Sequence, residues 1–267
     1  MSGIVNADNR SAAVIMAAGK GTRMKDPSKA KVMYSILGKP MIHYVVDLAM
    51  LLNVNRIVVI VGYQKEEVTK YLAASHPFAE CVIQEQQLGT GHAVMQARNV
   101  LSDFEGHVVI LSGDVPLLTK ESVDRLIAYH LETGAKATIL TANMADPTGY
   151  GRIIRGGDGM VVKIVEHRDA TPQELAIQEI NSGIYVFEKR NLFEGLELIK
   201  ADNVQQEYYL TGIFEHFVNR RWKVAGLPAQ QVDEIQGINT FEQLEAARKL
   251  MEAQKRYRVS TDRFEHS

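Results

Sequence analysis

The sequence predicts an α/β fold with a mixed central sheet. From residue 12 to about residue 142, short apolar runs alternate with amphipathic stretches, which is typical of parallel strands joined by crossover helices. After residue 142 the chain becomes rich in turn residues, with shorter strand patterns between the turns. A hydrophobic content of 46% and a charged content of 23% are those of an ordinary globular protein, so a disordered or fibrous chain is excluded.

The elements of the first half follow from this alternation. A buried strand is expected where several apolar residues run together, and a helix where apolar residues recur every three or four positions. The expected strands are Ala12–Ala17, Arg56–Val61, Ala79–Ile83, His107–Ser112 and Ala137–Thr141. The expected helices are Met41–Leu52, Glu66–Ala74, Ala93–Leu101 and Lys120–Thr133.

The second half is expected to complete a mixed sheet. Its expected strands are Val161–Val165 and Gly183–Phe187, and its expected helices are Gln206–Asn219 and Phe241–Lys255. We find no Pro-rich linker, low-complexity tract or internal repeat that would divide the chain. The sequence therefore predicts one domain over residues 12–258, made of halves at about 12–142 and 143–239 and a closing helix at about 240–257, with tails at 1–11 and 259–267.

Charge and cysteine content narrow the possible partners. Thirty Lys and Arg residues against thirty-two Asp and Glu residues leave no basic segment that would bind nucleic acid. The single cysteine, Cys81, cannot form an internal disulfide or a paired-thiolate zinc site, and its place in an expected strand favours a plain strand residue over a reactive thiol. Apolar runs are far shorter than the ~20 residues that cross a bilayer, and residues 1–11 lack a secretory signal. We expect a cytoplasmic protein without membrane partners.

A Gly-rich loop follows the first expected strand, with the sequence Met16-Ala-Ala-Gly-Lys-Gly-Thr-Arg-Met24. Glycines let backbone N–H groups approach an anion closely, and ligands bind beyond the carboxyl ends of strands in open α/β sheets. The P-loop and dinucleotide patterns are not met, because Lys20 is followed by Gly21 and the third glycine is replaced by Met24. Arg23 suits bidentate contact with phosphate oxygens. The loop therefore predicts a phosphate site, and a solvated turn is the alternative.

A second Gly-rich loop, residues 84–93, ends the third expected strand and opens a helix. The side-chain amides of this loop, among them that of Gln84, donate and accept hydrogen bonds, which matches the carbonyl oxygens and ring N–H of a uracil edge. The alternative is structural, with Gly89 and Gly91 making the turn and Thr90 capping the helix. Spacing alone favours neither interpretation.

A carboxylate follows the fourth expected strand, in Ser112-Gly-Asp-Val-Pro-Leu117. Asp114 at the end of an apolar strand is costly unless it is hydrogen-bonded or bound to a cation, and Mg²⁺ takes one or two protein oxygens while keeping waters and substrate phosphates. Asn239 offers a second oxygen ligand. The alternatives are that Asp114 starts a turn before Pro116 and that Asn239 is the N-cap of the last helix.

Histidines are expected to have structural or surface roles, because their spacing along the chain is not that of metal ligands. This prediction is made for five histidines that are expected to be isolated, His43, His76, His92, His107 and His167. His92 stands nearest the second Gly-rich loop, where capping or packing is a commoner role than reaction.

Taken together, these segments resemble the uridylyltransferase (pyrophosphorylase) domain of the bifunctional enzyme that makes UDP-N-acetylglucosamine, one of the sugar-nucleotide pyrophosphorylases. The resemblance runs from about residue 12 to about residue 255. Its motifs occur in order at 19–24, 31–32, 87–93, 113–114, 149–153, 166 with 169–171, 181–184, 203 with 205 and 207–211, and 237–239. It implies a Rossmann-like nucleotidyltransferase fold with an inserted sugar-binding lobe.

The resemblance also implies roles for individual residues. The nucleotide would be bound by Ala17, Ala18, Gly19, Gln84, Gly89, Thr90 and Gly113. Arg23 and Lys31 would act on the phosphates as the catalytic cations, and Asp114 and Asn239 would hold Mg²⁺. The sugar would contact Gly151, Glu166 and Asn181.

The implied reaction joins UTP and a sugar 1-phosphate, with N-acetylglucosamine 1-phosphate as the expected acceptor and a role in cell-wall biosynthesis. The acceptor phosphate is already ionised, so it attacks the α-phosphorus of UTP in line without a catalytic base, and pyrophosphate leaves. One alternative is another hexose 1-phosphate, above all glucose 1-phosphate. A second is a silent nucleotide-sugar-binding protein. A nicotinamide oxidoreductase is disfavoured, because the third glycine is missing and no acidic residue ends the second expected strand.

Three features depart from the family pattern. The segment Ser28-Lys-Ala-Lys31 is one residue longer than the usual Pro-Lys, and Lys31 is preferred over Lys29 because Val32 follows it. Gly212 stands where the family commonly has Asp after Tyr-Tyr-Leu-Thr. The acetyltransferase half of the bifunctional family has no counterpart in the sequence, so trimerisation through its β-helix is not expected.

Overall fold

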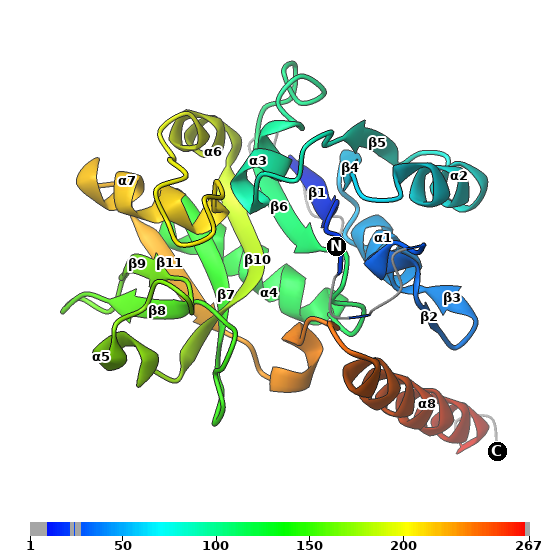
Figure 1. Ribbon diagram of the computed structural model, residues 1–267. Coiled ribbons are helices and arrows are strands. Elements are labelled where there is room, and N and C mark those ends of the chain that lie inside the picture. Colours follow the sequence, from blue (N-terminus) through cyan, green and yellow to red (C-terminus); the bar gives the residue numbers. More distant parts are fainter. Residues whose placement is uncertain (1–9, 22–23, 25–27, 265–267) are drawn as a thin grey trace.

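The computed structural model describes residues 10–21, 24 and 28–264, and the side chains among them up to residue 253 (Figure 1). Its centre is a nine-stranded mixed sheet with the order β11-β7-β10-β6-β1-β4-β5, to which β8 and β9 are attached. A small separate sheet pairs β2, Ser35–Ile36, with β3, Lys39–Pro40. The mixed α/β fold predicted from the sequence is thus observed.

The first half is a parallel sheet. The strand β1, Ser11–Ala17, lies between β4, Arg56–Val61, and β6, His107–Ser112, while β5, Glu80–Ile83, pairs with β4. The chain moves from β1 to β4 and β5 on one side and then returns to β6 on the other side. This reversal creates a crevice at the carboxyl end of β1, where open α/β sheets bind their ligands.

The second half turns the sheet from parallel to mixed. The long strand β10, Glu179–Glu188, is antiparallel to β6 and to β7, Ala137–Asn143, while β11, Val224–Pro228, is parallel to β7. A hairpin of β8, Arg152–Arg155, and β9, Val161–Val165, joins the sheet through β10. The register of β10 against β7 shifts between residues 181 and 185.

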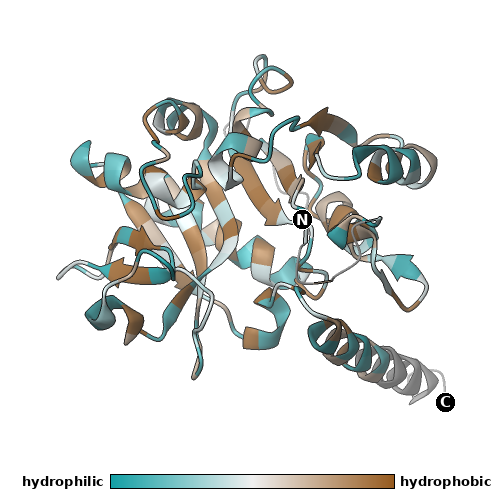
Figure 2. Ribbon diagram, viewed as in Figure 1, coloured by the Kyte–Doolittle hydropathy of each residue, from teal (hydrophilic) through white to brown (hydrophobic). Residues whose placement is uncertain are grey.

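Helices cover both faces of the sheet. One apolar core lies under α3, Thr90–Met95, α6, Lys189–Leu196, and α7, Ile213–Asn219. The other lies under α1, Met41–Leu51, α2, Lys65–Ser75, and α4, Lys120–Thr133. Neighbouring strand residues face opposite cores, so β1, β4 and β6 are apolar along most of their length, as strands covered on both faces are (Figure 2). The remaining helices are α5, Pro172–Leu175, α8, Phe241–Phe264, and 3₁₀ turns at Lys31–Met33, Leu210–Gly212 and Val232–Ile235.

Several predicted boundaries are wrong. The helix predicted over Ala93–Leu101 begins at Thr90 and ends at Met95, after which the chain continues in turns. The helix predicted over Gln206–Asn219 begins only at Ile213, because Tyr208 instead forms backbone hydrogen bonds with the second Gly-rich loop. The pattern of the sequence also missed β8, β11 and α6, and α8 continues beyond Lys255.

Cys81 lies in β5, and burial raises the pKa of its thiol, which supports the predicted plain strand role over a reactive one. Among the residues that the structure describes, none of the helices combines the length and the apolar character needed to cross a bilayer.

Candidate active site

A cavity of about 520 Å³ opens where β1, β5 and β6 end. Its walls come from segments far apart in the sequence, and most of the residues predicted to bind nucleotide and phosphate lie in them. The predicted residues in the walls are Ala17, Ala18, Gly19, Lys31, Gln84, Gly89, Thr90 and Asp114. Gly113 lies directly behind them, with its N–H donating to Met16 O at 2.9 Å. Arg23 lies outside the described residues.

Lys31 and Asp114 form the charged centre of this cavity. The Lys31 ammonium makes an ion pair with Asp114 Oδ2 and donates a hydrogen bond to Asn239 Oδ1 at 2.8 Å. Asp114 O accepts a hydrogen bond from Ile238 N at 2.9 Å, which brings the loop before α8 to the end of β6. Asp114 does lie in a turn, as one interpretation of the sequence expected, but its carboxylate is held by a cation. Two oxygen acceptors from distant segments therefore converge on one positive charge.

The neighbouring Lys29 does not share this position. Its ammonium lies over the ring of Tyr34, 5.2 Å from the centroid, and it is not among the residues that line the cavity. Of the two lysines, Lys31 is therefore the one that lines the cavity, and its phosphate role stays a prediction.

Asn239 is not the N-cap of α8, because another residue takes that role. Gln243 Oε1 accepts from the backbone N–H of Thr240 at 3.1 Å, and Gln243 N donates to Thr240 Oγ1 at 3.3 Å. This reciprocal pair is a capping box with Thr240 as the N-cap. The alternative that Asn239 caps the helix is therefore wrong, and its side-chain oxygen instead accepts from the Lys31 ammonium.

The amide of Gln84 is oriented by its neighbours. Its side chain is only 3% exposed, and its Nε2 donates to Gly89 O at 3.1 Å and to His92 Nδ1 at 3.0 Å. Because the Gly89 carbonyl can only accept, the nitrogen must point toward it. Within the described part of the chain no donor is seen on the Gln84 side-chain oxygen, which can therefore accept an N–H from a ligand in the cavity.

The turn before α3 needs glycine at position 89. Its φ is +109°, and a Cβ there would lie 2.7 Å from Tyr208 O and 2.9 Å from Tyr208 N. Thr90 is not the N-cap that one interpretation expected: Gly89 occupies that position, and the Thr90 hydroxyl accepts from Leu210 N at 2.9 Å. The second Gly-rich loop is thus joined to the segment around Tyr208.

A second cavity, of about 400 Å³, lies beside β9 and is lined in part by Glu166. Glu166 Oε1 accepts from Thr211 Oγ1 at 2.8 Å, and burial raises the pKa of the Glu166 carboxyl. A Cβ on Gly151 would lie 3.5 Å from Glu166 Oε2, and Asn181 N donates to Gly151 O at 2.9 Å. The three residues predicted to contact the sugar are therefore neighbours.

The side chain of Asn181 is already engaged. Its Nδ2 donates to Tyr185 Oη at 2.8 Å, and its Oδ1 accepts from Gly183 N at 3.2 Å, where Gly183 has a φ of +80°. Gly212 lines the second cavity with a φ of −64°, and a Cβ there would be 3.6 Å from the nearest atom of Ile199. Nothing in the local backbone requires glycine at this position.

Sequence reasoning missed some residues of the site and one cluster outside it. The first cavity is also lined by Gln87, Ser112 and Glu207, to which the sequence assigned no role. The only signal in the sequence that could have identified them is their position at the end of a strand or in a loop. The prediction that the histidines are isolated is wrong, since the rings of His43 and His76 lie 4.7 Å apart. No spacing along the sequence indicates this pair, because a helix and a loop bring it together.

Comparison with known proteins agrees with this geometry. A family model described as nucleotidyl transferase matches residues 12–231. Bifunctional protein GlmU of Exiguobacterium sibiricum is 50% identical over 227 residues, which cover 85% of this chain and 50% of that protein. Bifunctional protein GlmU of Geobacillus thermodenitrificans is 46% identical over 239 residues, which cover 90% of this chain and 51% of that protein. The chain spans about half the length of the curated relatives it matches.

Among solved structures, a crystal structure of UDP-glucose pyrophosphorylase complexed with UDP-glucose matches with a TM-score of 0.74. The match covers 92% of this chain and 99% of that chain, at 17% sequence identity. It confirms the fold class that was predicted from the sequence.

Proposed function

Because this chain belongs to the nucleotidyl transferase family, we propose that it transfers the uridylyl group of UTP to N-acetylglucosamine 1-phosphate, forming UDP-N-acetylglucosamine and pyrophosphate. The motifs of the sequence resemble the uridylyltransferase domain of the enzyme that makes this product, and relatives at 45 to 50% identity carry the name GlmU. Three further points stay predictions. They are a cytoplasmic location, the absence of nucleic-acid and membrane partners, and the division into a nucleotide-binding half at about 12–142 and a sugar-binding half at about 143–239.

One observation carries the proposal: the Gly-rich loop after β1, the amide of Gln84 and the Lys31–Asp114 pair line a single cavity. A nucleoside triphosphate needs a polar edge for its base and positive charge for its phosphates. Gln84 would offer the base an oriented oxygen, while Lys31, Lys20 and the backbone after Ala18, which line the same cavity, would face the phosphates. The cavity volume falls within the range of small-molecule sites.

The residues around Lys31 also fit a magnesium ion. Asp114 and Asn239 provide a carboxylate and an amide oxygen, which are the donors that Mg²⁺ prefers, and both already converge on a cation. Asp114 and Asn239 would hold the ion, and it would supply positive charge to the phosphates of UTP.

The chain itself would contribute positioning and charge. The acceptor phosphate is ionised near neutral pH, so no side chain has to remove a proton from it. Lys31 and Arg23 would stabilise the negative charge that grows on departing pyrophosphate, as preorganised cations do in phosphoryl-group transfer. Glu166, next to Gly151 and Asn181, would accept hydrogen bonds from the sugar.

Glucose 1-phosphate is not favoured as the acceptor. The solved UDP-glucose pyrophosphorylase shares the fold but only 17% of the sequence, whereas the GlmU relatives share 45 to 50%.

The test is pyrophosphate release by the purified chain, with UTP and a panel of sugar 1-phosphates, in the presence and absence of Mg²⁺. We expect turnover that requires the metal and is fastest with N-acetylglucosamine 1-phosphate and UTP. Equal or faster turnover with glucose 1-phosphate would refute the proposed acceptor. No pyrophosphate with any acceptor would refute the proposed reaction.

A further inference from the structure

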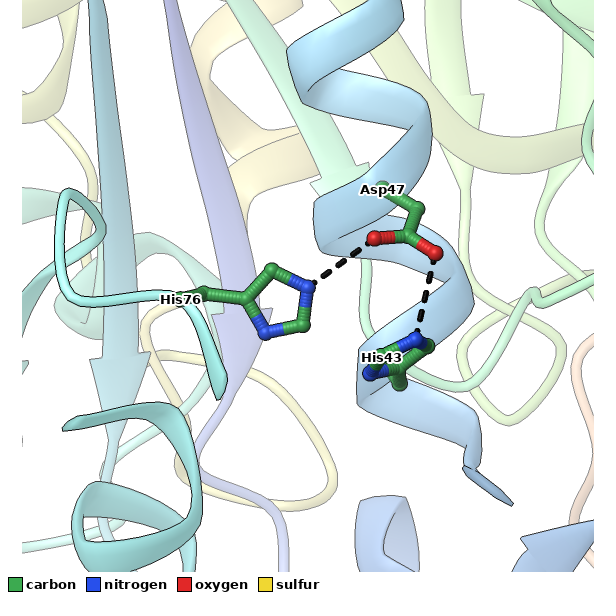
Figure 3. A group of neighbouring side chains, drawn as sticks. All are labelled: His43, Asp47 and His76. Atoms are coloured by element: carbon green, nitrogen blue, oxygen red, sulfur yellow. Dashed lines mark hydrogen bonds and ion pairs between the residues drawn. The ribbon is translucent and has the colours of Figure 1, made fainter. Parts of the chain in front are cut away.

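A cluster of two imidazoles and a carboxylate lies outside both cavities. His43 and Asp47 stand one turn apart on α1, and His76 directly follows α2 (Figure 3). His43 Nε2 is 3.2 Å from Asp47 Oδ2, and His76 Nε2 is 3.0 Å from Asp47 Oδ1. Figure 3 shows both rings directed at the same carboxylate. None of the three residues lines either cavity, so the proposed transferase reaction does not account for this arrangement.

The hydrogen bonds around His76 determine which ring nitrogen carries a proton. Ser75 Oγ donates to Tyr71 O at 2.9 Å, which uses its only proton. At the 2.8 Å contact between Ser75 Oγ and His76 Nδ1, the imidazole must therefore be the donor. His76 Nε2 is left facing Asp47, and the side chain is only 3% exposed. Two states of His76 fit the position of Nε2 beside Asp47. Either the ring is an imidazolium that donates to the carboxylate, or it is neutral and its Nε2 lone pair binds a cation that the carboxylate also binds.

The contacts of His43 define the tautomer of that second ring. Lys39 Nζ, which can only donate, lies 2.6 Å from His43 Nε2, so this nitrogen is an acceptor. His43 Nδ1 then donates to Tyr71 Oη at 2.9 Å. The Nε2 lone pair of His43 is thus directed at a position next to Asp47 that the ammonium of Lys39 occupies.

This pattern is the one that metal sites use to orient histidine ligands. Each imidazole binds an oxygen through Nδ1, which directs Nε2 toward the shared carboxylate. The ligand atoms around a tetrahedrally coordinated ion, at bond lengths of 2.0 to 2.1 Å, are roughly 3.3 Å from one another. The distances from Asp47 to the Nε2 atoms of His76 and His43, 3.0 and 3.2 Å, are close to this value. All candidate ligand atoms lie within 4.8 Å of one another.

We propose that His43, Asp47 and His76 bind a divalent ion of the zinc class, with the ammonium of Lys39 displaced and water completing the coordination. Two imidazoles and one carboxylate suit Zn²⁺, whereas Mg²⁺ prefers oxygen ligands alone. Lys39 is exposed and the Asp47 side chain is 44% exposed, so the ion has a path from solvent. The ion joins α1 to the end of α2 and stabilises the face of the sheet that these helices cover.

The experiment measures Zn²⁺ binding by the full chain, freed of metal and kept in excess Mg²⁺, in competition with a chromophoric chelator. We expect one Zn²⁺ per chain at this site and a higher Tm with Zn²⁺. His43→Gln and His76→Gln should each lower the affinity at least about tenfold, as loss of a ligand does. The matched control is His107→Gln, because His107 stands beside His130 but belongs to no group of three such ligands among the described residues.

Lys39→Ala separates a metal site from a hydrogen-bonded cluster. Removing the competing ammonium should raise Zn²⁺ affinity several-fold, whereas a structural role for the cluster predicts no increase. Circular dichroism checks folding, and if His76→Gln does not fold, the more accessible His43→Gln and Lys39→Ala carry the test with opposite expected signs. Affinities that are equal in the wild type, His43→Gln and Lys39→Ala would overturn the proposal. So would an NMR titration that finds His76 as an imidazolium unaffected by Zn²⁺.

Discussion

Replacing Lys31 by Met tests the charged centre of the first cavity. Met keeps most of the side-chain volume but removes the ammonium that contacts Asp114 and Asn239. Two unit charges ~4 Å apart attract by roughly 4 kcal/mol at an effective dielectric constant near 20. Asp114 already shares the charge of Lys31, so we expect about half of this, ~2 kcal/mol, to be lost from the transition state. That corresponds to a fall of roughly thirtyfold in kcat.

The assay is steady-state pyrophosphate release with UTP and N-acetylglucosamine 1-phosphate at saturating Mg²⁺. Lys29→Met is the matched control, because Lys29 lies over Tyr34 and does not line the cavity. It should retain kcat within about twofold of the wild type, since it removes the same charge at a greater distance from the phosphates. If Lys31→Met turned over like the wild type and Lys29→Met did not, the assignment of the phosphate role to Lys31 would be refuted.

Three further predictions address other parts of the site. Arg23→Ala should lower kcat by more than about tenfold while circular dichroism stays unchanged, and near-normal turnover would remove Arg23 from the reaction. Gly89→Ala should destabilise the fold by roughly 2 kcal/mol in urea unfolding, because the new Cβ meets Tyr208 at a positive φ, and an unchanged midpoint would contradict this close approach. Glu166→Gln should raise Tm relative to the wild type, by an amount that grows as pH rises above about 4, the ordinary pKa of a Glu carboxyl. Burial raises the pKa of Glu166 in the folded protein, so its ionisation costs stability as pH rises, and a Tm difference independent of pH would contradict this.

Periodicity predicted the parallel part of the sheet well because its strands are covered on both faces. Arg56–Val61 and His107–Ser112 are continuous apolar runs with matching observed bounds, and Lys120–Thr133 has a Thr at its N-cap and a Gly at its C-cap. The strand Val224–Pro228 was missed because it contains Gly and Pro and lies at the edge of the sheet. Its pairing with β7 is a tertiary contact that its own residues do not encode.

The candidate site was predictable to the extent that it lies at the ends of strands. Asp114 and the loop after Ala17 follow neighbouring parallel strands, so their proximity could be expected from strand order alone. Asn239 was ambiguous, because only the capping box shows that Thr240, and not Asn239, is the N-cap of α8. The Asn239 side chain instead contacts Lys31 beside Asp114. Whether Asn239 caps the helix or contacts Lys31 depends on which neighbouring side chain hydrogen-bonds the first backbone N–H groups of α8. The spacing of residues in the sequence does not determine that.

The two cavities share a wall, and this bears on how nucleotide and sugar would meet. Asn203 lines the second cavity, while its side chain donates to Glu207 O at 2.5 Å and accepts from Glu207 N at 3.1 Å. Glu207 in turn lines the first cavity, and the adjacent Tyr208 is hydrogen-bonded to the second Gly-rich loop. A shift of this wall would therefore change both cavities together. We expect that the residues which select the sugar lie from Gly151 onward, whereas those which select the base lie before β6. We also expect that the segment 203–211 sets the distance between the two groups.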